Sequence, residues 1–63
     1  MKYAIAFGAD KESWNNFSYR FGLIVVEARS LEQAEFMGLK EAKRQFPPAK
    51  GWANHDAIAE PIS

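Results

Sequence analysis

A single helix-forming segment constrains this chain more than any other feature. Ser30 can cap the N-terminus of a helix over residues 31–46, and Gln33 completes a Ser-x-x-Gln capping box. Two prolines follow Phe46 and cannot continue a helix, so the pattern predicts that the helix ends there. Because one helix covers only one face of a small sheet, the other face is expected to lack such a cover.

Three further segments have the character of strands. Residues 2–8 alternate large and small side chains, and residues 17–28 show the clearest two-residue period. Residues 55–62 are a short strand, in which Pro61 cannot donate a ladder bond and indicates an edge position. This element order predicts an α+β protein with a single small ββαβ domain over residues 1–63. A crossover helix makes the second and third strands parallel, so the first strand lies between them, in the order 2-1-3 and antiparallel to both.

The connections between these elements are polar or rich in turn-forming residues. Residues 9–16, ADKESWNN, are expected to connect the first two strands of a long hairpin. Residues 47–54 are expected to form a loop between the helix and the third strand. Gly22 lies within the second strand, where a glycine can mark a bulge that would move the following side chains to the opposite face.

Composition limits the classes of protein to which the chain can belong. The 63 residues include no cysteine, which excludes a disulfide framework and thiol chemistry and favours a reducing compartment. Eight Lys and Arg residues balance eight Asp and Glu residues, so the total charge does not favour nucleic acid or an anionic membrane. The N-terminal apolar run meets charge at Asp10, too early for a signal peptide or a membrane span, and we expect a cytoplasmic protein.

The volumes of the side chains predict which sheet face the helix covers. The inward stripe of the helix contains the small residues Ala34, Gly38 and Ala42, which need bulky partners to reach native packing density. The bulky face is predicted to comprise Tyr3, Ile5, Phe7, Phe17, Tyr19 and Phe21, with Ile58 and Ile62. The opposite face would show Lys2, Ala4, Ala6, Ser18, Arg20, Ala57 and Ala59, with Ile24 and Val26 if no bulge intervenes.

A flat, alanine-rich open face is the basis of the leading functional hypothesis. Such a face is too apolar for a surface that meets only solvent, and a second copy of the chain is the simplest partner. The sequence therefore predicts a non-catalytic protein-interaction module that forms a homodimer. The residues expected to carry self-association are Lys2, Ala4, Ala6, Arg20, Ala57 and Ala59.

Two other groups of residues are candidates for binding a partner. Phe36 and Met37 flank the buried stripe of the helix, where they either fold over the sheet margin or form an exposed anchor for another protein. Lys40, Lys43 and Arg44 form a basic helix end, which either complements the helix dipole or meets an anionic partner.

Nucleic-acid binding is the alternative function. The aromatic run FSYRF, together with Lys2, Arg20 and the basic helix end, contains the residue types of a stacking platform for single strands. The neutral total charge argues against this function, as does the need of a short chain for aromatic residues in its core.

The sequence favours a protein that is not an enzyme. Trp52 and His55 are the candidates for a ligand site, but neighbouring strand residues point to opposite faces, so Asp56 would not orient the imidazole. The simpler interpretation is that Trp52 closes one end of the core and His55 starts a strand. With one histidine and no cysteine, we expect neither a metal nor another cofactor.

Overall fold

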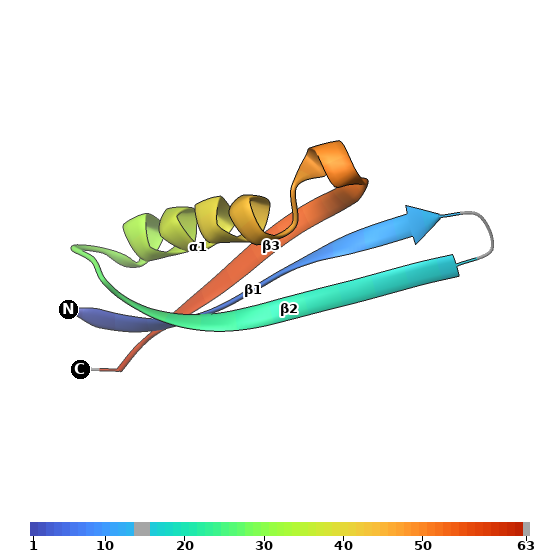
Figure 1. Cartoon of the computed structure of the whole chain (residues 1–63). Coiled ribbons are helices and arrows are strands. Elements are labelled where there is room, and N and C mark those ends of the chain that lie inside the picture. The colour runs from blue at the N-terminus through green and yellow to red at the C-terminus, as the bar shows by residue number, and fades with distance from the viewer. Residues whose placement is uncertain (14–15, 63) are drawn as a thin grey trace.

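A computed structural model describes residues 1–13 and 16–62 and confirms the predicted architecture. The elements are β1 (Lys2–Ser13), β2 (Asn16–Glu27), α1 (Leu31–Gln45), the short 3-10 helix η1 (Pro48–Lys50) and β3 (Trp52–Pro61). The sheet has the order β2-β1-β3, and both pairings are antiparallel. Figure 1 shows α1 lying along one face of the sheet, with both termini at the same end of the molecule. None of the described elements covers the other face.

The β1–β2 hairpin is longer than the sequence predicts. The segment 9–16 was expected to be a connection, but β1 continues to Ser13 and β2 begins at Asn16, and these two residues pair. Residues 14 and 15, including the tryptophan of the predicted connection, lie outside the described residues. The polar residues at the end of β1 belong to the strand because each pairs with a residue of β2; Glu12, for example, pairs with Phe17. This hairpin makes the molecule elongated, with extents of 43 × 17 × 14 Å.

The two ends of α1 form as the sequence predicts, with one variation. Ser30 Oγ accepts a hydrogen bond from the Gln33 amide at 3.1 Å. The backbone amide of Arg29, one residue before the cap, donates to Gln33 Oε1 at 2.6 Å. At the other end, the Phe46 amide donates to Ala42 O at 2.8 Å and closes the helix. An N-terminal capping bond such as that of Ser30 contributes about 1 kcal/mol. No helix among the described residues is long and apolar enough to cross a membrane.

The helix approaches the sheet most closely at Gly38. A Cβ atom at this position would lie 2.5 Å from Ile5 Cγ2 and 2.9 Å from Ala57 Cβ. Ala34 and Ala42, on the same stripe, are fully buried. The small residues of α1 therefore meet the bulky residues of the central strand, as predicted, and Ile5 is completely enclosed.

The pairing register decides which residues of β2 join this core. Residues directly opposite each other in an antiparallel pair project to the same face. Ile5 pairs with Ile24 and Phe7 pairs with Gly22, so the even-numbered residues of β2 face the helix side of the sheet. The Phe7 ring fills the space over Gly22, where an added Cβ would lie 2.6 Å from Phe7 Cζ. Gly22 is therefore a site of close packing, and the β1–β2 pairing continues past it without a shift.

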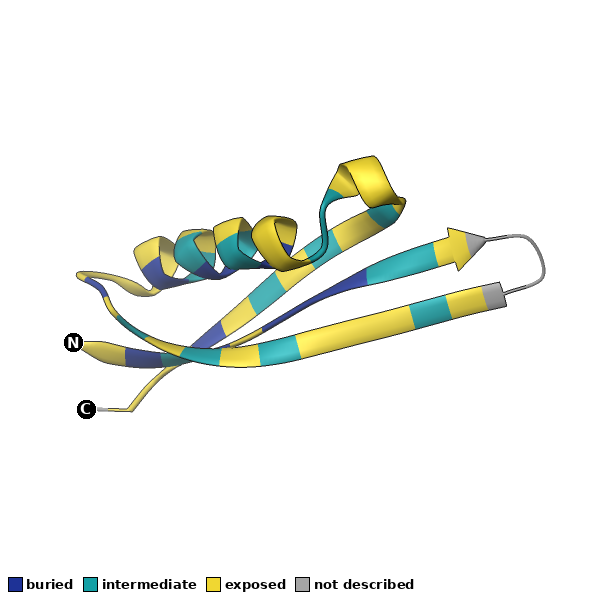
Figure 2. Ribbon diagram, viewed as in Figure 1, coloured by how far each residue is buried: buried dark blue, intermediate teal, exposed yellow. Residues whose placement is uncertain are grey.

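The predicted face assignment of β2 and β3 is wrong. The large residues expected under the helix but exposed in the structure are Phe17, Tyr19, Phe21, Ile58 and Ile62. The residues expected on the open face but placed on the helix side by the register are Ser18, Arg20, Ile24, Val26, Ala57 and Ala59. The prediction paired odd residues of β1 with odd residues of β2. The actual hairpin pairs odd with even, and a shift of one residue exchanges the faces. Figure 2 shows the result, with a buried centre in β1 and a largely exposed β2.

The Gly38 contact predicts a strong dependence of stability on side-chain size. Gly38→Leu should lower the free energy of unfolding by about 1–3 kcal/mol, because the added atoms would overlap Ile5 and Ala57. The measurement is the urea midpoint of unfolding. Lys43→Leu places the same side chain on an exposed position of α1 and should change stability by less than about 0.5 kcal/mol. Equal midpoints for the two variants would contradict the close approach.

Candidate interaction surface

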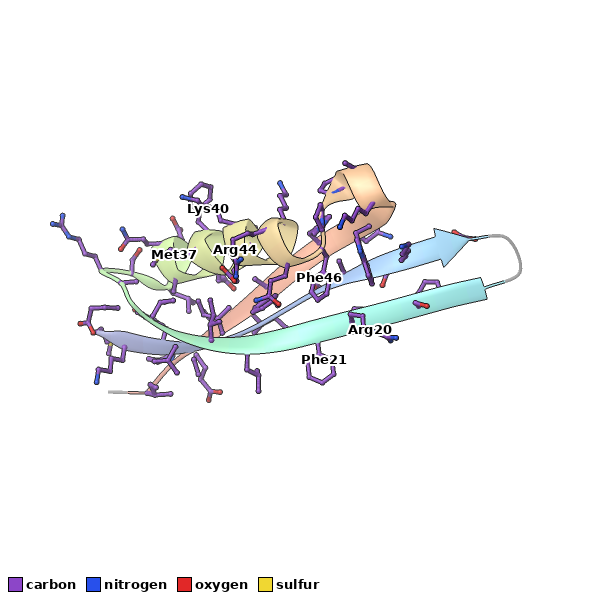
Figure 3. All side chains as sticks on the ribbon, viewed as in Figure 1. Arg20, Phe21, Met37, Lys40, Arg44 and Phe46 are labelled. Carbon is purple, nitrogen blue, oxygen red and sulfur yellow. The ribbon has the colours of Figure 1, made fainter. Side chains whose placement is uncertain are left out.

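The candidate site is the side of the sheet that faces away from α1, which we call the open face. Its apolar residues come from all three strands. They are Ala4, Ala6 and Gly8 of β1, Phe17, Tyr19, Phe21, Leu23 and Val25 of β2, and Ile58 of β3. The phenyl ring of Phe21 points away from the helix in Figure 3.

The open face has a row of large side chains beside a strip of small ones. Leu23 and Phe21 on β2 are 72% and 68% exposed. The neighbouring positions on β1 are alanine or glycine, and the Tyr19 ring lies directly over Gly8. Tyr19 and Phe21 stack with their ring centroids 6.4 Å apart.

The open face exposes more apolar area than is usual for a protein surface that contacts only water. Each aromatic side chain carries about 150–250 Å² of surface, so the three aromatic residues of β2 alone expose roughly 300 Å². The aliphatic residues of the same face add to this area. Contiguous apolar patches beyond a few hundred Å² mark binding surfaces on soluble proteins.

Carboxylates surround the apolar residues of the open face. Asp10 and Glu12 lie opposite Tyr19 and Phe17 in the β1–β2 pairing. On the same face, the register also places Glu27 beside Lys2, Asp56 beside Gly8 and Glu60 beside Ala4.

Only one lysine and the N-terminal amine offset these carboxylates. Lys2 lies at the end of the face that holds Glu27, and the N-terminal amine forms an ion pair with Glu27 at 2.9 Å. Around the aromatic residues the register places three carboxylates on this face, Asp10, Glu12 and Asp56, and no Lys or Arg position of the described residues. The aromatic half of the open face is therefore negatively charged.

The remaining cations lie on the helix side of the sheet or on α1 and its flanking loops. Lys11 projects to the helix side, with Nζ 5.5 Å from the centroid of the Trp52 ring. Arg20 lies opposite Ala9, a residue buried on the helix side, and its guanidinium donates a hydrogen bond to the carbonyl oxygen of Tyr19 at 3.2 Å. The chain is neutral in total, but its charges are divided between its two faces.

Trp52 and His55 close the core at the end of α1. Trp52 packs on Phe46 with ring centroids 4.9 Å apart, and Phe46 packs on Phe7 at 6.3 Å. His55 Nε2 donates to the carbonyl oxygen of Phe46 at 2.6 Å. A register shift in the β1–β3 pairing near Asn54, whose φ is +53°, directs both Trp52 and His55 toward the helix side. Trp52 therefore packs at the end of the core, but the predicted loop is shorter than expected: η1 occupies Pro48–Lys50, and β3 begins at Trp52 and not at His55.

The hydrogen bond of His55 leads to a prediction about stability. His55→Ala should lower the free energy of unfolding by about 1–2 kcal/mol, because the half-buried Phe46 carbonyl loses its donor. Thermal unfolding of both His55→Ala and His55→Gln would test this. Gln retains a donor and should recover part of the loss, whereas equal stability of wild type and His55→Ala would show that the bond contributes nothing.

Phe36 and Met37 do not form a common anchor. Met37 is half-buried and packs against the core. Phe36 is 62% exposed on the outer side of α1, with Lys40 Nζ 5.7 Å from its ring centroid. The structure separates these two candidates.

The basic helix end has less free charge than the sequence indicates. The Arg44 guanidinium bonds both carboxylate oxygens of Glu41, with Nε at 3.0 and 3.1 Å. Arg44, and after it Gln45, lower the pKa of Glu41 to about 2. Lys40 and Lys43 remain as exposed cations of this cluster, on the opposite side of the sheet from Lys2. The structure therefore does not gather the predicted nucleic-acid-binding residues on one surface.

The Glu41–Arg44 pair predicts a pH dependence. The pKa of Glu41 is lowered in the folded protein, so its stabilising contribution is complete above the ordinary value of 4.5 and is lost as the pH falls toward 2. We expect Arg44→Gln to raise the pKa of Glu41 toward 4.5, measured by the pH dependence of its side-chain carbon resonance. An unchanged pKa in this variant would contradict the pairing.

The described residues contain neither a ligand pocket nor a metal-binding cluster. No group of three or more His, Asp or Glu side chains among them could hold a metal ion. Comparison of the chain with protein-family models, with curated proteins and with solved structures gives no match.

The role of β2 as the main source of the candidate surface was not predicted from the sequence. The signal was the short distance in sequence between the two strands. If β1 is continued through its polar residues, only residues 14 and 15 separate the strands, and an even number of connecting residues pairs odd positions with even ones.

Proposed function

We propose that the protein is a non-catalytic interaction module that binds another polypeptide through the open face of its sheet. The observation that carries this proposal is the uninterrupted row of exposed large residues on β2 beside the small residues of β1. Covering this row would remove apolar area from water, which is the main driving force of protein association. A cytoplasmic location is part of the proposal and is supported by the absence of cysteine.

The composition of the open face favours a protein over a nucleic acid as the partner. The exposure of Phe17, Tyr19 and Phe21 meets one requirement of a base-stacking platform. However, the carboxylates beside these rings would repel phosphate groups, and the Arg20 guanidinium already donates to the carbonyl oxygen of Tyr19. An apolar centre with a charged rim is instead typical of protein–protein interfaces.

Self-association through this face is the form of the function that the sequence predicts. With the corrected face assignment, the β2 row and Ile58 join Lys2, Ala4 and Ala6 on the surface available to a second copy. Arg20, Ala57 and Ala59 do not belong to this surface, because the register places them on the helix side.

Site-specific photocrosslinking in cells that produce the protein tests the proposal. A photoreactive phenylalanine analogue at Phe21 should give a discrete protein adduct, because this side chain lies at the centre of the open face. The adduct should decrease at least about tenfold when Leu23→Glu is added to the same chain, because a buried carboxylate opposes binding. Mass spectrometry of the adduct shows whether the partner is a second copy.

Phe36 provides a matched control, since it has a similar exposure on the opposite side of the molecule. The analogue at Phe36 should give no adduct that depends on Leu23. Indistinguishable adducts from the two positions, or insensitivity of the Phe21 adduct to Leu23→Glu, would contradict the proposed binding surface.

A further inference from the structure

We infer that the partner of the open face is a basic amphipathic segment of another protein, with apolar residues flanked by Lys or Arg. This inference rests on the proposed function and adds to it the chemistry of the partner. The apolar row of β2 accounts for binding, and the carboxylates around it determine the charge of the chain that binds.

The negative charge of the open face determines which charge the contacting residues of a partner should have. Asp10, Glu12 and Asp56 lie around the aromatic residues, and among the described residues the register places no Lys or Arg on that half of the face. A partner that covers the rings brings its own flanking residues next to these carboxylates. Lys and Arg in those positions form ion pairs, whereas Asp and Glu would be repelled.

The aromatic residues reinforce the same preference. The rings of Tyr19 and Phe21 are stacked and exposed, and aromatic faces attract cations. The structure already contains such contacts on its other side, where Lys11 lies over Trp52 and Lys40 over Phe36. The aromatic half of the open face has the rings and the carboxylates, but the register places no Lys or Arg of the described residues there.

A second copy satisfies this preference poorly. Two open faces packed together would lie about 10 Å apart. Each copy contributes five carboxylates, from Asp10, Glu12, Glu27, Asp56 and Glu60. Among the described residues, the positive charges on the open face of each copy are Lys2 and the N-terminal amine. Like charges facing each other across an interface oppose association, so a basic partner is favoured over self-association.

Two short synthetic amphipathic peptides test the inference. One contains leucine and lysine, and the other contains leucine and glutamate in the same pattern. The protein is titrated with each, and binding is followed by the amide and methyl resonances of Ala4, Ala6 and Ile58. We expect the lysine peptide to bind about tenfold more tightly at low salt, since several exposed ion pairs form together. High salt should remove most of this difference.

A pair of matched variants separates specific charge recognition from total charge. Asp10→Lys with Asp56→Lys should remove the preference for the lysine peptide. Glu32→Lys with Glu35→Lys changes the total charge equally, but on α1, and should leave the preference in place. Equal effects of the two pairs would overturn the inference, because total charge alone would then explain the preference.

The outcomes distinguish this inference from the proposed function. Equal binding of both peptides at the open face would overturn the basic partner and leave the interaction surface intact. A stable dimer in light scattering at micromolar concentration, dissociated by Leu23→Glu, would also overturn the inference, because a second copy then occupies the face. If neither peptide shifts the open-face resonances and the protein stays monomeric, both proposals fail.

Discussion

The antiparallel pairing of β1 with β2 is the constraint on which the rest of this structure depends. β1 has large residues at Tyr3, Ile5 and Phe7, and the pairing register decides which half of β2 accompanies them under α1. Pairing of odd with even positions puts Gly22 and Ile24 there and leaves the aromatic row on the opposite face. A shift of one residue would bury the aromatic row and abolish the surface on which the functional account rests.

Steric fit between the helix and the sheet supports this register. Gly38 lets α1 approach the central strand, and Gly22 makes room for the Phe7 ring. Aromatic residues at the even positions of β2 would leave no space for Phe7 under the helix. The glycines therefore matter here because they have no side chain, and both face the core. In the described residues this packing covers one face of the sheet and leaves the large residues of β2 exposed on the other.

Much of the fold could be predicted from the sequence, but the interaction surface could not. The capping residues, the proline stop and the small stripe of α1 are local signals, and the helix, the strand order and the contact through Gly38 follow from them. The face assignment depends on the register of a hairpin whose polar residues resemble a loop. The division of charge between the two faces could not be predicted from composition, because an acidic open face and a more basic helix side add to a neutral total.

Measurement of solvent exposure along β2 distinguishes the two possible pairing registers of the hairpin. A soluble paramagnetic agent added to the dilute protein broadens the methyl resonances of exposed side chains. The account predicts strong broadening for Leu23 and Val25 on the open face and weak broadening for Ile24, which packs against the core. Stronger broadening for Ile24 than for Leu23 would show that β2 pairs in the other register. The open face would then lack its aromatic row, and the proposed binding surface would be wrong.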